Sequence, residues 1–143
     1  MFMGEFNHSL DPKNRAFIPA KFREGLGESF VITAGLDGCL YLCPMSDWEA
    51  FATKLSELPF TKETREFQRF FMQNAAECEP DKQGRIIIPA NLKELAGIEK
   101  DIVFVGVIGK VELWSKERLE AGKPDETMEE IAEKMSTEFG LRF

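Results

Sequence analysis

Two arginines that stand in the same ten-residue pattern are the residues of this sequence best suited to binding chemistry. The pattern Asp-x-x-x-Arg-x-x-x-Pro-Ala occupies residues 11–20 and returns at residues 81–90. A guanidinium group carries a rigid fork of donors that fits a phosphate or the edge of a guanine base. Arg15 and Arg85 are therefore candidates for contacts with nucleic acid. The alternative is structural: the aspartate four residues earlier could pair with each arginine and hold the turn closed, and the two roles are compatible.

Basic and amide side chains stand beside each arginine. Lys13 and Asn14 separate the aspartate from the arginine in the first copy, and Lys82 and Gln83 hold similar places in the second. At the tip of a turn these side chains could contact phosphate, or they could simply face water. The same two alternatives apply to three bases on the short helices that are expected after the motifs, namely Lys21, Arg23 and Lys93.

The charge of the chain is distributed unevenly. The whole sequence has 25 acids, 18 bases and a net charge of -7, which taken alone argues against a nucleic-acid partner. Residues 11–23 nevertheless carry a net charge of +3 and residues 81–93 one of +2, whereas residues 44–80 and 115–143 each carry -3. The two repeats are thus basic regions in an acidic chain.

Both copies predict the same order of elements: strand, turn, strand, short helix, strand, strand. Alternation of apolar and polar residues indicates the strands, and proline and glycine mark the turns and helix ends. Pro19 is expected in the first turn of the first short helix, and Gly25-Leu-Gly27 is expected to close that helix. The predicted class is α+β, with strands at 2–9, 15–18, 29–34, 39–42, 75–79, 85–88, 102–107 and 111–114 and short helices at 19–23 and 89–96.

Longer helices follow each copy. Ser46-Asp-Trp-Glu49 has the form of a capping box and predicts a helix that Pro59 ends. A second helix is expected over residues 62–74. Ser115 is expected to cap a short helix and Asp125 a longer one. The longer helix carries an apolar stripe at Met128, Ile131, Ala132, Met135 and Phe139.

Three phenylalanines form a second stripe at helical spacing, Phe67, Phe70 and Phe71. Aromatic side chains could stack on the bases of a single strand. A contact with the core or with another subunit is the better interpretation, because an apolar face on a small domain needs a packing partner.

Several classes of protein find no support in the sequence. There is no apolar run of about 20 residues for a membrane span and no signal-peptide pattern, so we expect a cytoplasmic protein. Three cysteines and one histidine offer neither a disulfide framework nor a zinc site. No catalytic motif is present, so we expect no enzyme, no cofactor and no small-molecule substrate.

The doubled Asp-x-x-x-Arg-x-x-x-Pro-Ala motif, set in two β-turn-β-α-β-β units, resembles the MraZ family of bacterial transcriptional regulators, within the AbrB-like swapped-hairpin superfamily. The resemblance covers essentially the whole chain. It implies that the two units interlock into a double-split barrel that forms one pseudo-dimer. We expect the first unit at residues 1–60, a connecting helix at 61–74 and the second unit at 75–143.

The resemblance also implies a function. Family members assemble into rings, commonly octamers or dodecamers, and bind short direct repeats in the promoter of the division and cell wall gene cluster. The DNA-facing residues carried over are Asp11, Arg15, Asp81 and Arg85, with Lys13 and Lys82 as phosphate contacts. The chain would then act on the nucleoid, and the phenylalanine stripe would supply ring contacts. The alternative is a self-assembling scaffold or protein-interaction module without specific DNA recognition.

Overall fold

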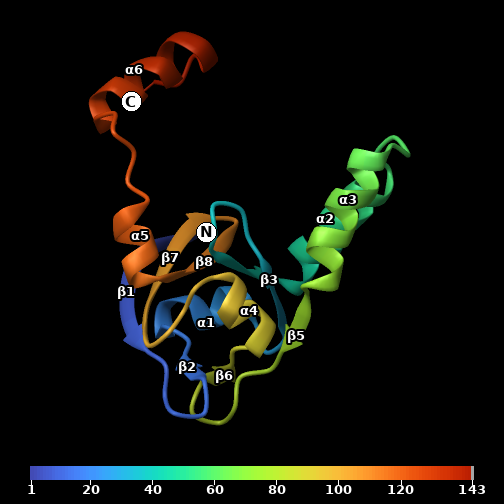
Figure 1. Cartoon of the computed structure of the whole chain (residues 1–143), viewed down its shortest axis with the longest axis vertical. Helices are drawn as coiled ribbons and strands as arrows, with labels where there is room; N and C mark the ends of the chain where they lie inside the picture. The colour runs from blue at the N-terminus through green and yellow to red at the C-terminus, as the bar shows by residue number, and fades with distance from the viewer. Residues whose placement is uncertain (143) are drawn as a thin grey trace.

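The structure is a computed structural model that describes residues 1–142. It is built from a six-stranded antiparallel sheet, a separate two-stranded ribbon and six helices (Figure 1). The strands are β1 (Phe2–Ser9), β2 (Arg15–Phe17), β3 (Phe30–Ala34), β4 (Leu40–Pro44), β5 (Ala76–Cys78), β6 (Arg85–Ile87), β7 (Asp101–Ile108) and β8 (Lys110–Ser115). The helices are α1 (Ala20–Leu26), α2 (Met45–Ser56), α3 (Lys62–Gln73), α4 (Ala90–Leu95), α5 (Lys116–Ala121) and α6 (Met128–Phe139).

The two repeats exchange strands throughout. The order in the large sheet is β1-β7-β8-β4-β3-β5, so β1 of the first repeat pairs with β7 of the second, and β5 of the second pairs with β3 of the first. β4 pairs with β8, and β2 pairs with β6 to form the small ribbon. The α+β class and the doubled order of elements are confirmed. Within residues 1–142 the sheet stays open, with β1 and β5 at its edges.

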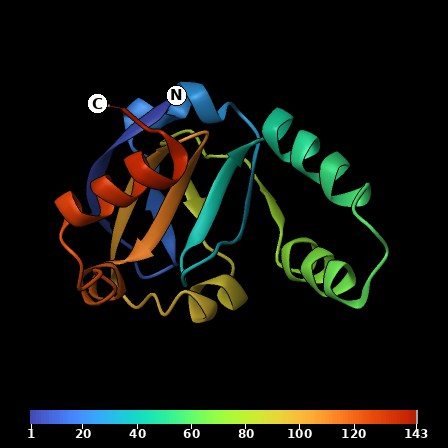
Figure 2. The same ribbon diagram turned by 90° about the horizontal axis from the view of Figure 1, so that it is seen from above.

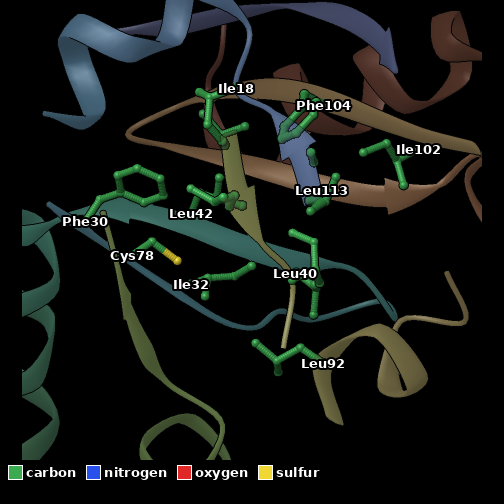
Figure 3. Packing of buried hydrophobic residues seen from close by; sticks show 14 of the residues in the cluster. Ile18, Phe30, Ile32, Leu40, Leu42, Cys78, Leu92, Ile102, Phe104 and Leu113 are labelled. Atoms are coloured by element: carbon green, nitrogen blue, oxygen red, sulfur yellow. The ribbon is translucent and has the colours of Figure 1, made fainter. Parts of the chain in front are cut away.

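One core lies between the sheet, the ribbon and the short helices α1 and α4 (Figure 3). Both repeats contribute equivalent residues to it: Ile18 and Ile88 follow the ribbon strands, and Phe22 and Leu92 come from the two helices. Each of these four side chains is almost fully buried. Because neither repeat could bury these residues alone, the interlocked arrangement supplies most of the stabilising apolar burial.

Three helix boundaries differ from the sequence predictions. α1 continues beyond Arg23 to Leu26, because Leu26 is buried in the core and Gly25 leaves room for the Phe2 ring; a Cβ at Gly25 would lie 2.7 Å from a ring carbon. The expected closing segment Gly25-Leu-Gly27 is confirmed, with Gly27 as the C-cap. α2 begins at Met45, directly after Pro44 leaves the sheet, so Ser46 is not a cap. α6 is capped by the Thr127 side chain and not by Asp125.

The helices after each repeat extend away from the core. α2 and α3 form a pair near one edge of the sheet, and α6 lies near the other edge, beyond α5 (Figures 1 and 2). The prediction that Ser115 caps α5 is confirmed, since its hydroxyl accepts the backbone N–H of Arg118. None of the helices within residues 1–142 combines the length and apolar character needed to cross a membrane.

Candidate nucleic-acid interface

The two Asp-x-x-x-Arg turns have nearly the same hydrogen-bond geometry. Oδ1 of Asp11 accepts the backbone N–H groups of Lys13 at 2.9 Å and of Arg15 at 2.8 Å. Oδ1 of Asp81 accepts the N–H groups of Gln83 and Arg85, both at 2.9 Å. An aspartate is suited to this place because its short carboxylate reaches the backbone two and four residues ahead.

The second carboxylate oxygen of each aspartate binds the arginine of its own turn. Arg15 Nε lies 2.7 Å from Asp11 Oδ2, and Arg85 Nε lies 2.9 Å from Asp81 Oδ2. The structural alternative for the aspartates is therefore confirmed. Within residues 1–142 the hydrogen bonds of both guanidinium groups run through Nε alone, and both arginine side chains are partly exposed.

The bonds in each turn favour ionised aspartates. Partial desolvation raises the pKa of Asp11, but the hydrogen bonds from the Arg15 backbone and side chain and from the Lys13 backbone outweigh it and hold the pKa below its usual value. For Asp81 the backbone N–H of Arg85 is the largest influence, and the pKa is again lowered. Both carboxylates are thus charged at neutral pH and fix their arginines in place.

Acid is expected to weaken both turns. Because the pKa of each aspartate is lower in the folded chain, the unfolded chain binds more protons below about pH 4. The stability that the carboxylates contribute is present above this pH and is lost as the pH falls through the folded pKa. The Asp11→Asn/Asp81→Asn variant should be less stable at neutral pH than the unmodified chain. Its unfolding free energy, measured with urea, should depend less on pH between about 5 and 2.

Two exposed acids outside the turns provide the control for this prediction. Glu120→Gln/Asp125→Asn removes the same number of carboxylates from exposed positions near α5 and α6. This control should keep the full pH dependence of stability. An unchanged slope in the Asp11/Asp81 variant would contradict a stabilising role for the two turn carboxylates.

The β2–β6 ribbon joins the two turns and carries four side chains on its outward face. Arg15 lies opposite Ile87, and Phe17 lies opposite Arg85. The central pair, Ala16 and Ile86, points inward and is buried. The guanidinium carbon of Arg85 lies 5.8 Å from the centre of the Phe17 ring. The outward face is therefore a two-by-two patch of two arginines and two apolar side chains, related by the approximate two-fold symmetry of the repeats.

Phe17 and Ile87 were missed as candidate site residues. Phe17 is 45% exposed and Ile87 is 64% exposed, although both lie in apolar runs of the sequence. Strand alternation is the signal that could have found them, since residues two apart in a strand share one face. Phe17 is two residues after Arg15, and Ile87 is two after Arg85.

Two bases on the short helices, Lys93 and Arg23, lie against the two turns, and their contacts with the two turns differ. Lys93 Nζ donates to Asn14 Oδ1 at 2.9 Å, which ties α4 to the first turn. Arg23 Nε donates to the carbonyl of Ile18 at 2.9 Å, and its guanidinium lies so close to Gly84 that a Cβ there would be 2.5 Å from Arg23 Cζ. Asn14 and Gly84 both have positive φ, 60° and 80°. Each of these two bases therefore contacts the turn of the other repeat.

The structure brings all eleven sequence-predicted DNA-binding residues to one end of the molecule, around β2, β6, α1 and α4 (Figure 1). Lys13, Lys82 and Gln83 are exposed at the turn tips, and Lys21 is exposed on α1. The set holds seven bases against two acids, and both acids are paired with arginine. α6 and the far end of the α2–α3 pair lie at the opposite end. The basic turns are thus separated in space from the acidic segments.

The phenylalanine stripe on α3 is only partly exposed to solvent. The Phe71 ring is buried and makes edge contacts at 5.0 Å with both Phe67 and Phe70. Phe70 is half-buried against the main core, and Phe67 is 41% exposed. Of the three residues predicted to make subunit contacts, Phe71 therefore packs inside its own chain and Phe67 offers the main accessible surface.

Comparison with known proteins agrees with the repeated architecture. A family model described as MraZ protein matches residues 1–70 and again residues 71–138. The chain is 58% identical over 143 residues to a protein of Lachnoclostridium phytofermentans named transcriptional regulator MraZ, and the alignment covers 100% of both chains. Proteins of the same name from Pelotomaculum thermopropionicum and Clostridium beijerinckii are each 56% identical over 138 residues, covering 94% and 95% of this chain and 95% and 97% of theirs.

Proposed function

This chain belongs to the MraZ family, and from that premise we propose that it is a sequence-specific, double-stranded DNA-binding transcriptional regulator. One observation carries the proposal: the outward face of the β2–β6 ribbon presents two arginines, each fixed by an aspartate of its own turn. A two-stranded ribbon is narrow enough to enter the major groove of B-DNA, where arginine can bind guanine through two donors. The protein would act by binding and not by catalysis.

The bases around the ribbon supply the phosphate contacts in this proposal. Lys13 and Lys82 flank the arginines at the turn tips and would reach the backbone on either side of the groove. Lys21, Arg23 and Lys93 extend the basic surface along α1 and α4. The proposed target is promoter DNA with short direct repeats, upstream of the division and cell wall gene cluster, bound in the cytoplasm on the nucleoid.

Direct repeats call for several copies of the ribbon at once, and we propose that the chain forms a ring-shaped homo-oligomer of eight or twelve copies. α6 supports this part of the proposal. Met128 is 65% exposed, Phe139 is 72% exposed, and none of the extensive contacts between elements of residues 1–142 involves α6. A 12-residue helix is marginally stable in isolation, so an apolar stripe of this kind needs a partner.

A groove near the other edge of the sheet suits that stripe. Trp48 and Phe51 of α2, Phe67 of α3 and Leu36 of the β3–β4 turn line a cavity of about 400 Å³, with Lys110 at its edge. α6 bears four acids and one base, and the groove lining includes one base, Lys110, that could pair with one of these acids, together with one acid, Asp47. Because α6 and the groove lie on opposite sides of one chain, the proposed occupant is α6 of a second copy (Figures 1 and 2). Such a head-to-tail contact repeats until a ring closes.

A gel-shift experiment tests the proposed function. The protein should retard DNA from upstream of its own gene in preference to a scrambled fragment of the same length and composition. Five phosphate-contacting bases per chain, repeated in several copies of the assembly, imply a steep salt dependence, with affinity falling about a thousandfold or more between roughly 50 and 200 mM salt. Repeated sites bound by an assembly gain further from effective concentration. Equal retardation of both fragments would contradict sequence-specific regulation.

The apolar groove and the α6 stripe also favour a second candidate function, a self-assembling scaffold or protein-interaction module. In that case the assembly would form without any preference for the upstream DNA. The same gel shift separates the two functions, because a scaffold predicts equal and weak retardation of both fragments, with assembly unaffected.

A further inference from the structure

The outward face of the ribbon carries two apolar side chains that a basic, phosphate-binding surface would not require. Phe17 and Ile87 occupy diagonal corners of the four-residue patch, and Arg15 and Arg85 occupy the other two. Large apolar side chains on a strand with a free face are costly in water, and both are well exposed. The core does not require them, since Ala16 and Ile86 fill the inward face of the same ribbon.

The chemistry of the major groove offers a partner for such side chains. Thymine is the base that presents a methyl group there, and apolar side chains contact it. Guanine presents the two acceptors that suit arginine. We infer that Phe17 and Ile87 form a thymine-methyl contact site, so that the patch reads guanine through its arginines and thymine through its apolar corners. This inference rests on the proposed DNA-binding function and adds a base preference to it.

Each apolar side chain lies beside one of the two arginines. The Arg85 guanidinium lies over the Phe17 ring, and the antiparallel register places Ile87 directly opposite Arg15. Directly opposite residues of an antiparallel pair lie about 5 Å apart at Cβ, a distance between one and two steps of about 3.4 Å along a DNA strand. An arginine and its apolar neighbour could therefore address adjacent bases.

Replacing thymine by deoxyuridine tests this inference, because uracil keeps the hydrogen-bonding edge and lacks only the methyl group. The upstream fragment is first footprinted with the unmodified protein. Single thymines in the protected segment are then replaced one at a time. At contacted positions the affinity should fall about fourfold, the effect of one buried methyl group. Phe17→Ala and Ile87→Ala should each abolish this thymine preference at its own position while still binding the fragment.

Control variants separate this outcome from unfolding and from loss of DNA binding. Phe17→Leu keeps an apolar side chain and should retain the thymine preference. Met3→Ala removes an apolar side chain from β1 that is as exposed as Ile87, and it should change nothing. Thermal unfolding checks that every variant is folded. A thymine preference that survives in Phe17→Ala/Ile87→Ala would overturn the inference, and so would specific binding by the unmodified protein that no uracil substitution weakens. Failure to prefer the upstream fragment at all would instead overturn the proposed function.

Discussion

Arg15→Ala combined with Arg85→Ala is expected to remove specific binding of the upstream DNA. A well-placed arginine bound to guanine through two donors accounts for about 1–3 kcal/mol of base discrimination. Two such contacts in every copy of an assembly give a combined loss of at least about a hundredfold in affinity. The turns should survive the change, because Oδ1 of each aspartate keeps its two backbone hydrogen bonds. The measurement is a titration of labelled DNA at fixed salt.

Two further variants make this result interpretable. Lys116→Ala/Lys123→Ala removes the same amount of charge from exposed positions near α5 and should bind DNA nearly as well as the unmodified protein. Arg15→Lys/Arg85→Lys keeps the charge but loses the planar fork. If the arginines read bases, the lysine variant should bind both the upstream and the scrambled fragment, with little preference between them. Full specificity in the alanine variant would show that the arginines are not part of the recognition surface.

Phe139→Asp is expected to convert the assembled protein to a 16.3 kDa monomer. The substitution places a charge in the apolar stripe of α6, which would have to be buried against the groove of the next copy. Phe67→Asp should have the same effect from the side of the groove. Thr137→Asp, on the opposite face of α6, is the matched control and should leave the assembly intact. Light scattering coupled to gel filtration measures the mass of each variant.

A mixture of the two monomeric variants tests the direction of the contact. Phe139→Asp retains an intact groove, and Phe67→Asp retains an intact α6. If α6 of one copy enters the groove of the next, the mixture should form a dimer with one chain of each variant and grow no further. A contact between like surfaces would leave both variants monomeric. Assembly of either variant alone to full size would show that α6 and the groove do not meet.

Features that depend on local spacing could be predicted from the sequence. The Asp11–Arg15 and Asp81–Arg85 pairs are four residues apart, so a tight turn brings them together whatever surrounds it. Strands and helices followed from alternation and from proline. Helix ends depend also on packing in the folded chain: α1 continues beyond the predicted Arg23 to Leu26, whose side chain is buried in the core.

Contacts between the repeats could not be predicted from local patterns. The register that sets Phe17 opposite Arg85 follows from the pairing of strands nearly 70 residues apart, which no short window of sequence contains. The bond between Lys93 and Asn14 joins residues 79 positions apart for the same reason. The composition of Ala16-Phe17-Ile18 does not indicate that Phe17 is exposed, because all three residues are apolar. Only the alternation of side chains along the strand places Phe17 on the outward face.

In the proposed DNA complex, the unequal contacts of the two turns would give the ribbon a direction along DNA. A symmetric dimer presents identical half-sites across its two-fold axis and is matched by a palindrome. In the first turn, Asn14 accepts a hydrogen bond from Lys93. In the second turn, Gly84 lies against the guanidinium group of Arg23 instead. The two ends of the patch therefore differ in shape and in donors, and a reversed site would present the wrong bases to each. A chain of this kind can distinguish one orientation of a short asymmetric sequence from the other, as tandem sites of equal polarity require.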